Sequence, residues 1–391
     1  HGEGGWVREH NVWRPYNDYD ILVVGGEKLS HRDLQGLRTR LASKLDIRWV
    51  DITWTNKLRL RSLRPSIFSY DLKHASTLLA GDNSVFRWVR PGPAGKLPLR
   101  EAVTLFRTRL WTFLGSTMPD EFGKRISDEP ARFFRNQMAK ATLAAVGVLL
   151  LRHGLYHHSY VERVKRGSRL PEISGDDAQR FRWALHERLQ PDGSALDGLA
   201  MLDHYNRTQD LFSRHMLMGI SSYLRRPLAS VPEVADYYET HWRFRLHRIA
   251  KTLIKGWTAT HRSRSLDLAQ MYLFAAYSPD SIDAHLARKA AVLLNALDSN
   301  VTADSNWHQL RVVARQRRGL NVKTAARATI DGFWGGASHH DRNTPDRPRD
   351  HRQRIKFVVL TIPGHLFFTQ QRLQYFQRFV EDLLGGFQRH A

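Results

Sequence analysis

The chain has 391 residues, with 60 Lys and Arg against 38 Asp and Glu, so its formal charge is +22. At about 150 residues per domain this length predicts two to three domains. The 42% share of hydrophobic residues is that of a globular protein and not of a disordered one. The chain has no Cys, which excludes disulfides, thiol nucleophiles and thiolate metal sites.

The most apolar stretch runs from Ala141 to Leu151, between Lys140 and Arg152. It is shorter than the roughly 18 residues that cross a membrane, so we expect no membrane span. No signal peptide is visible, and we therefore expect a cytoplasmic protein. The excess of positive charge predicts an anionic partner such as nucleic acid, nucleotide phosphates or an acidic polymer. A general preference for Arg is the alternative, because the basic residues are spread along the whole chain.

Residues 1–90 have the pattern of a mixed α/β domain. The apolar run Ile21–Val24, followed by two glycines, predicts a buried strand and a turn. Ser30 and Asp33 have the spacing of a capping box, which predicts a helix over 31–45. The apolar residues of this helix recur at helical spacing: Leu34, Leu37, Leu41 and Leu45.

Two further strands are expected in this domain. The alternation over Ile47–Trp54 predicts a second strand, and a third strand or hairpin is expected through Ile67–Leu79, ending at Gly81-Asp82. The stretch 90–98 is rich in Pro and Gly and predicts a linker.

Beyond the linker the pattern becomes helical. Helices are expected over 100–115, 131–153, 176–190, 196–224, 234–256, 265–277 and 281–298. Residues 339–354 are basic and poor in apolar residues, which predicts an exposed loop, and a strand at Phe357–Ile362 and a helix at 366–385 follow. The sequence therefore predicts an α+β fold, with a small mixed sheet and helices in 1–90 and a large, mostly α-helical domain in 99–391.

Two carboxylates mark the start of the first strand. Asp18 and Asp20 lie two residues apart, and the period of a strand places both on one face. Neighbouring carboxylates repel each other unless a cation lies between them. Mg²⁺ suits such a pair, because it binds one or two carboxylates together with substrate phosphates. The alternative is an ordinary turn and a solvated strand end.

A third carboxylate, Asp51, interrupts the second apolar strand. If the two strands are neighbours in the sheet, Asp18, Asp20 and Asp51 converge into a site for two metal ions. Such a site activates an attacking hydroxyl and stabilises a leaving pyrophosphate.

This arrangement resembles the nucleotidyltransferase superfamily of the DNA polymerase β type. In that family a Gly-Ser turn precedes a strand with Asp-x-Asp, and a third Asp lies on a neighbouring strand. Asp18, Asp20 and Asp51 match this pattern. The resemblance implies Mg²⁺ or Mn²⁺ as cofactor and an NTP, most often ATP, as substrate. It also implies that Asp51 helps to deprotonate the acceptor hydroxyl.

The glycine-rich start of the chain is similar to the end of a run that follows the Gly-Ser turn in many bacterial members. The resemblance implies triphosphate contacts at Gly2, Gly4 and Gly5. The Gly-Ser pair that would hold the triphosphate is absent from this chain, and we expect it just upstream of His1.

Three later segments also resemble bacterial nucleotidyltransferase-like proteins. Tyr70–Asp82 is similar to the segment after the third acid, and 136–141 and Tyr156–Tyr160 are similar to the first helices of the C-terminal domain. In antibiotic nucleotidyltransferases a Lys or Arg of the helical domain reaches the triphosphate, and Lys140 is the candidate here. The alternative for Lys140 is an ordinary surface lysine.

The sequence thus predicts a metal-dependent nucleotidyltransferase that moves an NMP from an NTP to an acceptor hydroxyl and releases pyrophosphate. Its active site is expected in a cleft between the two domains, with Lys140 and neighbouring Arg or His residues on the helical side. The acceptor stays open between a small molecule, a saccharide, a protein and RNA. The alternative is a catalytically degenerate member that acts as a basic module binding nucleic acid or another partner.

Two weaker patterns are kept as alternatives. The stretch from Arg207 to His215 is similar to an Arg-x(4–6)-His ribonuclease motif, although seven residues lie between its Arg and its His. Several Trp residues could stack on bases, but they more often lie in a core: Trp6, Trp13, Trp49 and Trp54.

Overall fold

The computed structural model describes residues 6–9, 12–15, 19–26, 30–45, 50–116, 122, 124–241, 257–277, 281–297, 301–302, 305, 309–314 and 357–361. Several residues and segments of the sequence-based predictions lie outside these ranges: Gly2, Gly4, Gly5, Asp18, Trp49, the loop 339–354 and the helix 366–385.

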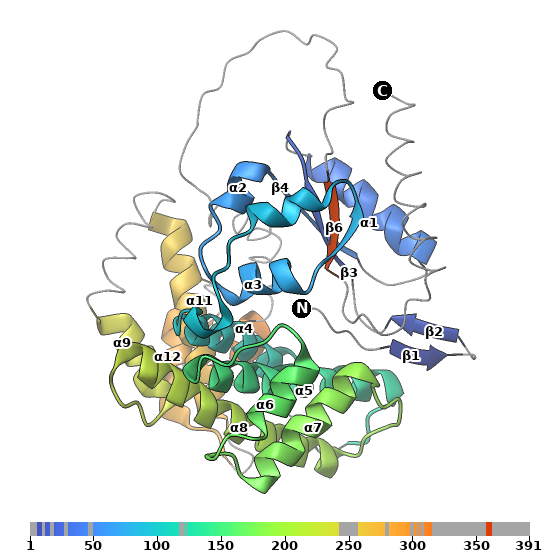
Figure 1. Ribbon diagram of the computed structural model, residues 1–391. Coiled ribbons are helices and arrows are strands. Elements are labelled where there is room, and N and C mark those ends of the chain that lie inside the picture. The colour runs from blue at the N-terminus through green and yellow to red at the C-terminus, as the bar shows by residue number, and fades with distance from the viewer. Residues whose placement is uncertain are drawn as a thin grey trace.

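A four-stranded mixed sheet stands over a bundle of helices (Figure 1). Its strands are β3 (Tyr19–Val24), β4 (Val50–Thr55), β5 (Thr77–Ala80) and β6 (Phe357–Thr361), in the order β4-β3-β6-β5. Strands β3 and β4 run parallel, whereas β6 runs antiparallel to both β3 and β5. A separate antiparallel hairpin, which the sequence pattern did not predict, consists of β1 (Trp6–Glu9) and β2 (Val12–Pro15).

The first two predicted strands are confirmed. Ile21–Val24 is buried throughout, as expected for a strand that is covered on both faces. In β4, Val50, Ile52 and Trp54 are buried, whereas Asp51 and Thr53 are partly exposed. The two faces of β4 therefore meet different surroundings.

Helix α1 (His31–Leu45) is confirmed together with its capping box. The Ser30 hydroxyl accepts a hydrogen bond from the Asp33 backbone N–H at 3.1 Å, and the Asp33 carboxylate accepts one from the Ser30 backbone N–H at 3.2 Å. These contacts satisfy backbone donors that the first turn of a helix leaves unpaired. Leu34, Leu37 and Leu41 are buried on one face of α1.

The expected strand or hairpin over Ile67–Leu79 is wrong in its first half, because Ile67–His74 is helix α3. The helix starts from a capping box in which Ser66 and Ser69 each accept a hydrogen bond from the backbone N–H of the other, at 3.1 and 3.0 Å. The predicted end of the strand is confirmed: β5 ends at Ala80, and Gly81 follows with a φ of 102°, which favours glycine.

The strand predicted near the end of the chain is confirmed as β6, but it does not belong to the helical domain. It lies between β3 and β5, and it pairs with both. Without β6, the facing edges of β3 and β5 would carry unpaired backbone groups. The division into 1–90 and 99–391 must therefore be corrected, since residues from both parts form the sheet.

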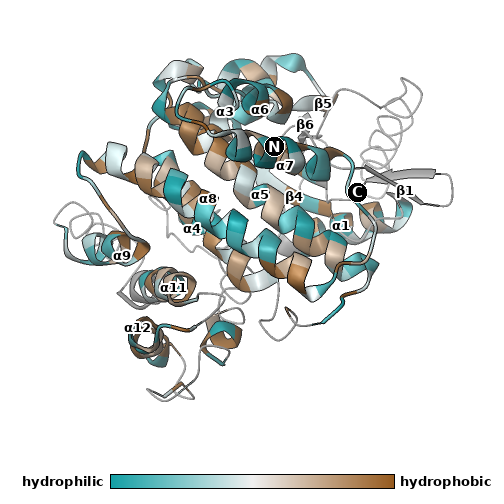
Figure 2. Cartoon of the chain, turned by 90° about the horizontal axis from the view of Figure 1, so that it is seen from below, coloured by the Kyte–Doolittle hydropathy of each residue, from teal (hydrophilic) through white to brown (hydrophobic). Residues whose placement is uncertain are grey.

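The remaining described residues are mainly helical, as predicted. The helices are α4 (Glu101–Ser116), α5 (Asp128–Arg152), α6 (Tyr160–Gly167), α7 (Gly175–Leu189), α8 (Gly198–Leu224), α9 (Val231–Thr240), α11 (Trp257–Ala276) and α12 (Ala284–Asn295). In Figure 2, α4, α5 and α8 lie together, and α9, α11 and α12 form a second group beside them. Of these helices, α6 was not predicted.

The apolar stretch Ala141–Leu151 lies in the C-terminal half of α5, and every one of its residues is buried in the bundle. This helix therefore serves as the core against which α4, α7 and α8 pack. None of the helices that the structure describes has an apolar stretch that could cross a membrane.

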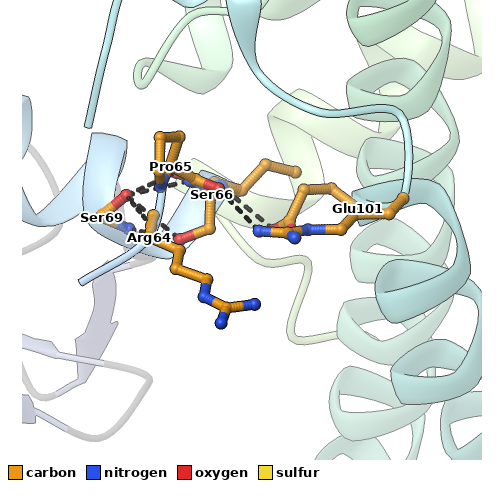
Figure 3. A network of polar contacts seen from close by, with 7 residues as sticks. Arg64, Pro65, Ser66, Ser69 and Glu101 are labelled. Atoms are coloured by element: carbon orange, nitrogen blue, oxygen red, sulfur yellow. Dashed lines mark hydrogen bonds and ion pairs between the residues drawn. The ribbon is translucent and has the colours of Figure 1, made fainter. Parts of the chain in front are cut away.

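The expected linker 90–98 is a packed connection. Its Leu97 lies in one buried cluster with Tyr70 of α3 and Tyr156 of the segment between α5 and α6. Glu101, at the start of α4, accepts a hydrogen bond from the Ile67 backbone N–H at 3.1 Å (Figure 3). Helix α3 is therefore joined to the helical bundle through both apolar and polar contacts.

Candidate active site

Two of the three predicted carboxylates lie side by side in the sheet. In the parallel pairing of β3 and β4, Asp20 is the direct partner of Asp51. Partners in a parallel pair project from the same face of a sheet, so these two side chains share a face. Asp20 is exposed and Asp51 is half-exposed. The structure therefore brings together two carboxylates that are far apart in the sequence.

The face that carries the two carboxylates also carries helix α3. Further along this face, Leu22 and Val24 of β3 lie in a buried cluster with Leu72 of α3. This cluster also contains residues of α2 (Lys57–Arg61) and of the 3₁₀ helix η1 (Asn83–Trp88). Helix α1 packs against β4 from the other face (Figure 1). The sheet thus lies between two helical layers, with Asp20 and Asp51 near the start of its two parallel strands.

An arginine of α1 reaches Asp51 around the outer edge of β4. One Arg38 Nη lies 3.6 Å from an Asp51 carboxylate oxygen, and it also donates a hydrogen bond to the Ile52 carbonyl at 2.8 Å. β4 is an edge strand of the sheet, and its Ile52 carbonyl accepts this hydrogen bond from Arg38. Arg38 therefore fixes the position of Asp51, and it also competes with any cation for that carboxylate.

The side chains at this site meet only some of the requirements of a divalent cation such as Mg²⁺. Two exposed carboxylates on one face are ligands of the kind that Mg²⁺ and Mn²⁺ prefer. Within the part of the chain that the structure describes, no three His, Asp or Glu side chains are grouped closely enough to hold a metal ion. Asp18, the third expected ligand, lies outside the described residues.

A buried carboxylate that the sequence did not single out as functional joins the sheet part to the helical bundle. Asp71 of α3 is 2% exposed, and it accepts hydrogen bonds from the Tyr156 hydroxyl at 3.1 Å and from an Arg163 Nη at 3.2 Å. Arg163 also donates to the backbone carbonyls of His157 and His158. Asp71 and Tyr156 are 85 positions apart in the sequence, and the structure places them in contact.

Arg163 belongs to a cluster of cations inside the helical bundle. Arg109 of α4 lies close enough to Arg163 of α6 and to Arg188 of α7 for its charge to interact with theirs. Burial lowers the pKa of Arg109, and the charges of Arg188 and Arg163 lower it further. Burial raises the pKa of the Tyr160 hydroxyl, whereas the charges of Arg188, Arg163 and Arg109 lower it.

Lys140 lies on α5, one helical turn after a residue that contacts this cluster. Arg188 donates a hydrogen bond to the Asn136 side chain at 3.0 Å, and Asn136 precedes Lys140 by one helical turn. Residues four apart on a helix share a face. Lys140 is half-buried, so it differs from a fully exposed surface lysine. Arg109, Arg163 and Arg188 are cations that the sequence analysis did not find, because helix patterns do not show which residues of different helices meet.

Histidine and tyrosine rings lie over the same junction. The His158 ring stacks on His157 and on His74, with ring centroids 4.2 and 6.0 Å apart. Burial, together with the neighbouring His157, lowers the pKa of His158 to about 4. Burial also lowers the pKa of His74, with a contribution from Lys73. The lowered pKa values of His158 and His74 favour the neutral form of these two rings near pH 7.

The alternative ribonuclease pattern does not form a common exposed site. Arg207 is exposed and pairs with Asp203 at 2.8 Å, whereas His215 is 3% exposed and lies 3.7 Å from Asp177. A cavity of about 550 Å³ between α7 and α8 is lined by Arg207 and Asp177, but His215 is not among its lining residues.

No family model matches the chain, and no curated protein and no solved structure is significantly similar to it.

Proposed function

We propose that the protein is a metal-dependent nucleotidyltransferase. The observation that carries the proposal is the register of β3 and β4, which makes Asp20 and Asp51 direct neighbours on one exposed end of a sheet face. Two carboxylates so close together repel each other, and a divalent cation between them removes this repulsion.

Each acid has a role in the proposal. Asp20 and Asp51, together with Asp18, would hold Mg²⁺ or Mn²⁺, which would offset negative charge on the transferring phosphoryl group. Asp51 accepts the proton of the acceptor hydroxyl, and the hydroxyl oxygen bonds to the α-phosphorus of the NTP. The bond from this phosphorus to the bridging oxygen breaks, and pyrophosphate leaves. Arg38 orients Asp51 through the contact at 3.6 Å.

The cations for the triphosphate come from the helical bundle in this proposal. A triphosphate carries more negative charge than metal ions alone neutralise, and Arg or Lys side chains commonly complete its binding. Arg109, Arg188 and Lys140 are the candidates: the charge of Arg188 acts on Arg109, Arg188 binds Asn136 one helical turn before Lys140, and the neighbouring Arg163 binds Asp71 of α3. Helix α3 packs on the same sheet face as Asp20 and Asp51, which supports a site at this junction. Gly2, Gly4 and Gly5 remain proposed triphosphate contacts, and ATP remains the proposed NTP.

The ion pair between Arg38 and Asp51 favours a second candidate function. If Arg38 permanently occupies Asp51, the protein would be a degenerate member of this fold that binds nucleic acid or another partner without catalysis. The two functions differ in whether the acids are needed for any transfer of a nucleotide.

The test is incubation of the protein with α-labelled ATP, Mg²⁺ and cell extract, followed by separation of the labelled fractions. We expect label on an acceptor with the native chain, and loss of at least about 99% of it with Asp20→Asn or Asp51→Asn, as for removal of a catalytic group. Asp82→Asn is the matched control, because Asp82 is exposed and Asn retains the capping oxygen that Ser84 uses. Equal labelling by all variants, or none by the native chain with any NTP, would overturn the proposal.

A further inference from the structure

We propose that the surface formed by α2 and η1 binds single-stranded nucleic acid. This α2–η1 surface consists of Lys57, Leu58 and Arg61 of α2, Arg87 and Trp88 of η1, and Arg90, which lies two residues after the end of η1. The inference does not depend on the proposed nucleotidyl transfer, since it concerns binding at a separate surface.

The first observation is that the two sequence segments around this surface contain basic residues and no acidic ones. Residues 52–70 and 83–100 contain no Asp or Glu, whereas they contain four basic residues each. These two segments include α2 and η1, which pack against each other. Asp82 caps the start of η1, and its pKa is lowered chiefly by its hydrogen bonds with Ser84 and to a smaller extent by Arg87. The fold therefore concentrates positive charge from two segments in one place.

The second observation is exposure. Lys57, Arg61, Arg87 and Arg90 are all exposed. Exposed Lys and Arg side chains neutralise phosphates and release counterions, which provides most of the affinity for a nucleic-acid backbone. Long basic side chains in a core or in ion pairs would not be available for this purpose.

The third observation is apolar and aromatic surface between the cations. Leu58 is 74% exposed on the surface of α2. Trp88 of η1 is partly exposed, and the Lys57 ammonium lies 4.8 Å from the centroid of its ring. Rings and apolar side chains beside cations suit unpaired bases, which stack on or pack against them, whereas a duplex hides its base faces. The mixture therefore favours a single strand over a duplex or an anionic lipid surface.

The α2–η1 surface lies away from the proposed active site. Helix α2 follows directly after the end of β4, whereas Asp51 lies near its start. At about 3.3 Å per strand residue, Asp51 and Thr55 are separated by roughly 13 Å along β4. Figure 1 shows α2 at the end of the sheet that is remote from the helical bundle. A nucleic-acid strand bound to the α2–η1 surface would therefore lie apart from the residues that are proposed to bind the metal ion and the triphosphate.

The test is fluorescence anisotropy with a fluorescein-labelled oligo(U) of about 20 nucleotides, without NTP or metal ion, so that loss of catalysis cannot affect it. The surface variant combines Arg61→Gln, Arg87→Gln and Arg90→Gln. The control variant removes equal charge from exposed arginines of the helical bundle: Arg169→Gln, Arg182→Gln and Arg288→Gln. Equal thermal unfolding midpoints of the two variants show that both are folded.

We expect the surface variant to bind oligo(U) at least about tenfold more weakly than the control variant at ~0.1 M salt. The slope of log K against log salt should become shallower by about 0.7 for each phosphate that the variant no longer neutralises, or about 2 in total. Leu58→Gln should weaken binding without changing this slope, because the interaction of Leu58 with a base is not electrostatic. Equal affinities of the two triple variants would overturn the proposal, as would tighter binding of a duplex of the same length or binding to anionic vesicles alone.

Discussion

At the scale of single residues, the contact between Asp71 and Arg163 is a buried ion pair that links α3 to the helical bundle. Both side chains are buried, and Tyr156 adds a hydrogen bond to the same carboxylate. Removal of one partner from a buried pair leaves the other charge without compensation, which costs much more than the pair itself contributes. The stability of the junction should therefore depend strongly on Asp71.

We predict that Asp71→Ala lowers the free energy of unfolding by about 3–5 kcal/mol. Asp203→Ala is the control, because Asp203 forms an exposed ion pair with Arg207 and should contribute less than about 1 kcal/mol. Urea denaturation followed by circular dichroism measures both values. A similar small loss for the two variants would contradict the assignment of Asp71 as a structural link.

The rings at the same junction predict a dependence of stability on pH. The pKa of His158 is lowered to about 4 in the folded protein, mainly by burial, whereas an unfolded His titrates near 6.5. Between these values the unfolded chain binds a proton that the folded protein does not, so stability falls as the pH falls from about 6.5 to about 4. Above this window the contribution of His158 to the pH dependence disappears.

We therefore predict that His158→Gln makes the free energy of unfolding less dependent on pH in this window. His285→Gln, at an exposed position on α12, is the control and should leave the native dependence unchanged. Urea titrations at several pH values between about 4 and 7 provide the measurement. Parallel curves for the native chain and both variants would show that His158 does not titrate as described.

At the scale of elements, the bundle depends on a close approach between α5 and α8. A Cβ at Gly219 of α8 would overlap with the Val148 side chain of α5, and it would lie 3.2 Å from the Ala102 Cβ of α4. These neighbours are fully buried, so they have little room to move. The glycine is therefore needed for helix packing and not for an unusual backbone conformation.

We predict that Gly219→Ala destabilises the protein by about 1–3 kcal/mol, as is typical of overpacking. The matched control is Gly36→Ala in α1, where an added Cβ meets nothing within 4 Å. That exchange should stabilise the protein by about 0.5–1 kcal/mol, because Ala favours a helix more than Gly does. Thermal unfolding of both variants distinguishes the two effects. Destabilisation by both exchanges would contradict the prediction, because it would show that these helices do not tolerate an added methyl group at either position.

Local signals explain which elements could be predicted from the sequence. The Ser30 cap and the spacing of four leucines define helix α1 without help from distant residues. The error at Ile67–Leu79 has a local cause as well, because the Ser66 and Ser69 capping box was not recognised. The place of β6 could not be predicted, since its pairing with β3 joins residues that are more than 300 positions apart in the sequence.

The candidate site shows the same limit. The two-residue spacing of Asp18 and Asp20 and the interruption of an apolar strand by Asp51 were enough to single out Asp20 and Asp51. Their direct pairing depends on the register of β3 and β4, which the sequence alone does not fix. Arg38, Arg109, Arg163 and Arg188 meet their partners only through tertiary packing, and helical spacing within one segment gives no sign of it.

At the scale of the whole molecule, the sheet part and the helical bundle meet at one junction. The sheet contains strands from both ends of the chain, and the cluster around Leu97 and Tyr156 joins α3 to the helical bundle. In the proposed function this junction brings acids from the sheet and cations from the helices to one substrate. The α2–η1 surface lies at the other end of the sheet, so that binding of nucleic acid and transfer of a nucleotide can be measured separately.

The central claim is that Asp20 and Asp51 together bind the catalytic metal ion. Electron paramagnetic resonance of Mn²⁺ added to the native chain tests it most directly, because bound Mn²⁺ loses its free-ion signal. We predict that Asp20→Asn and Asp51→Asn each weaken Mn²⁺ binding at least about tenfold, since each removes a charged ligand, whereas Asp82→Asn has no effect. Equal Mn²⁺ binding by the native chain and all three variants would contradict the claim.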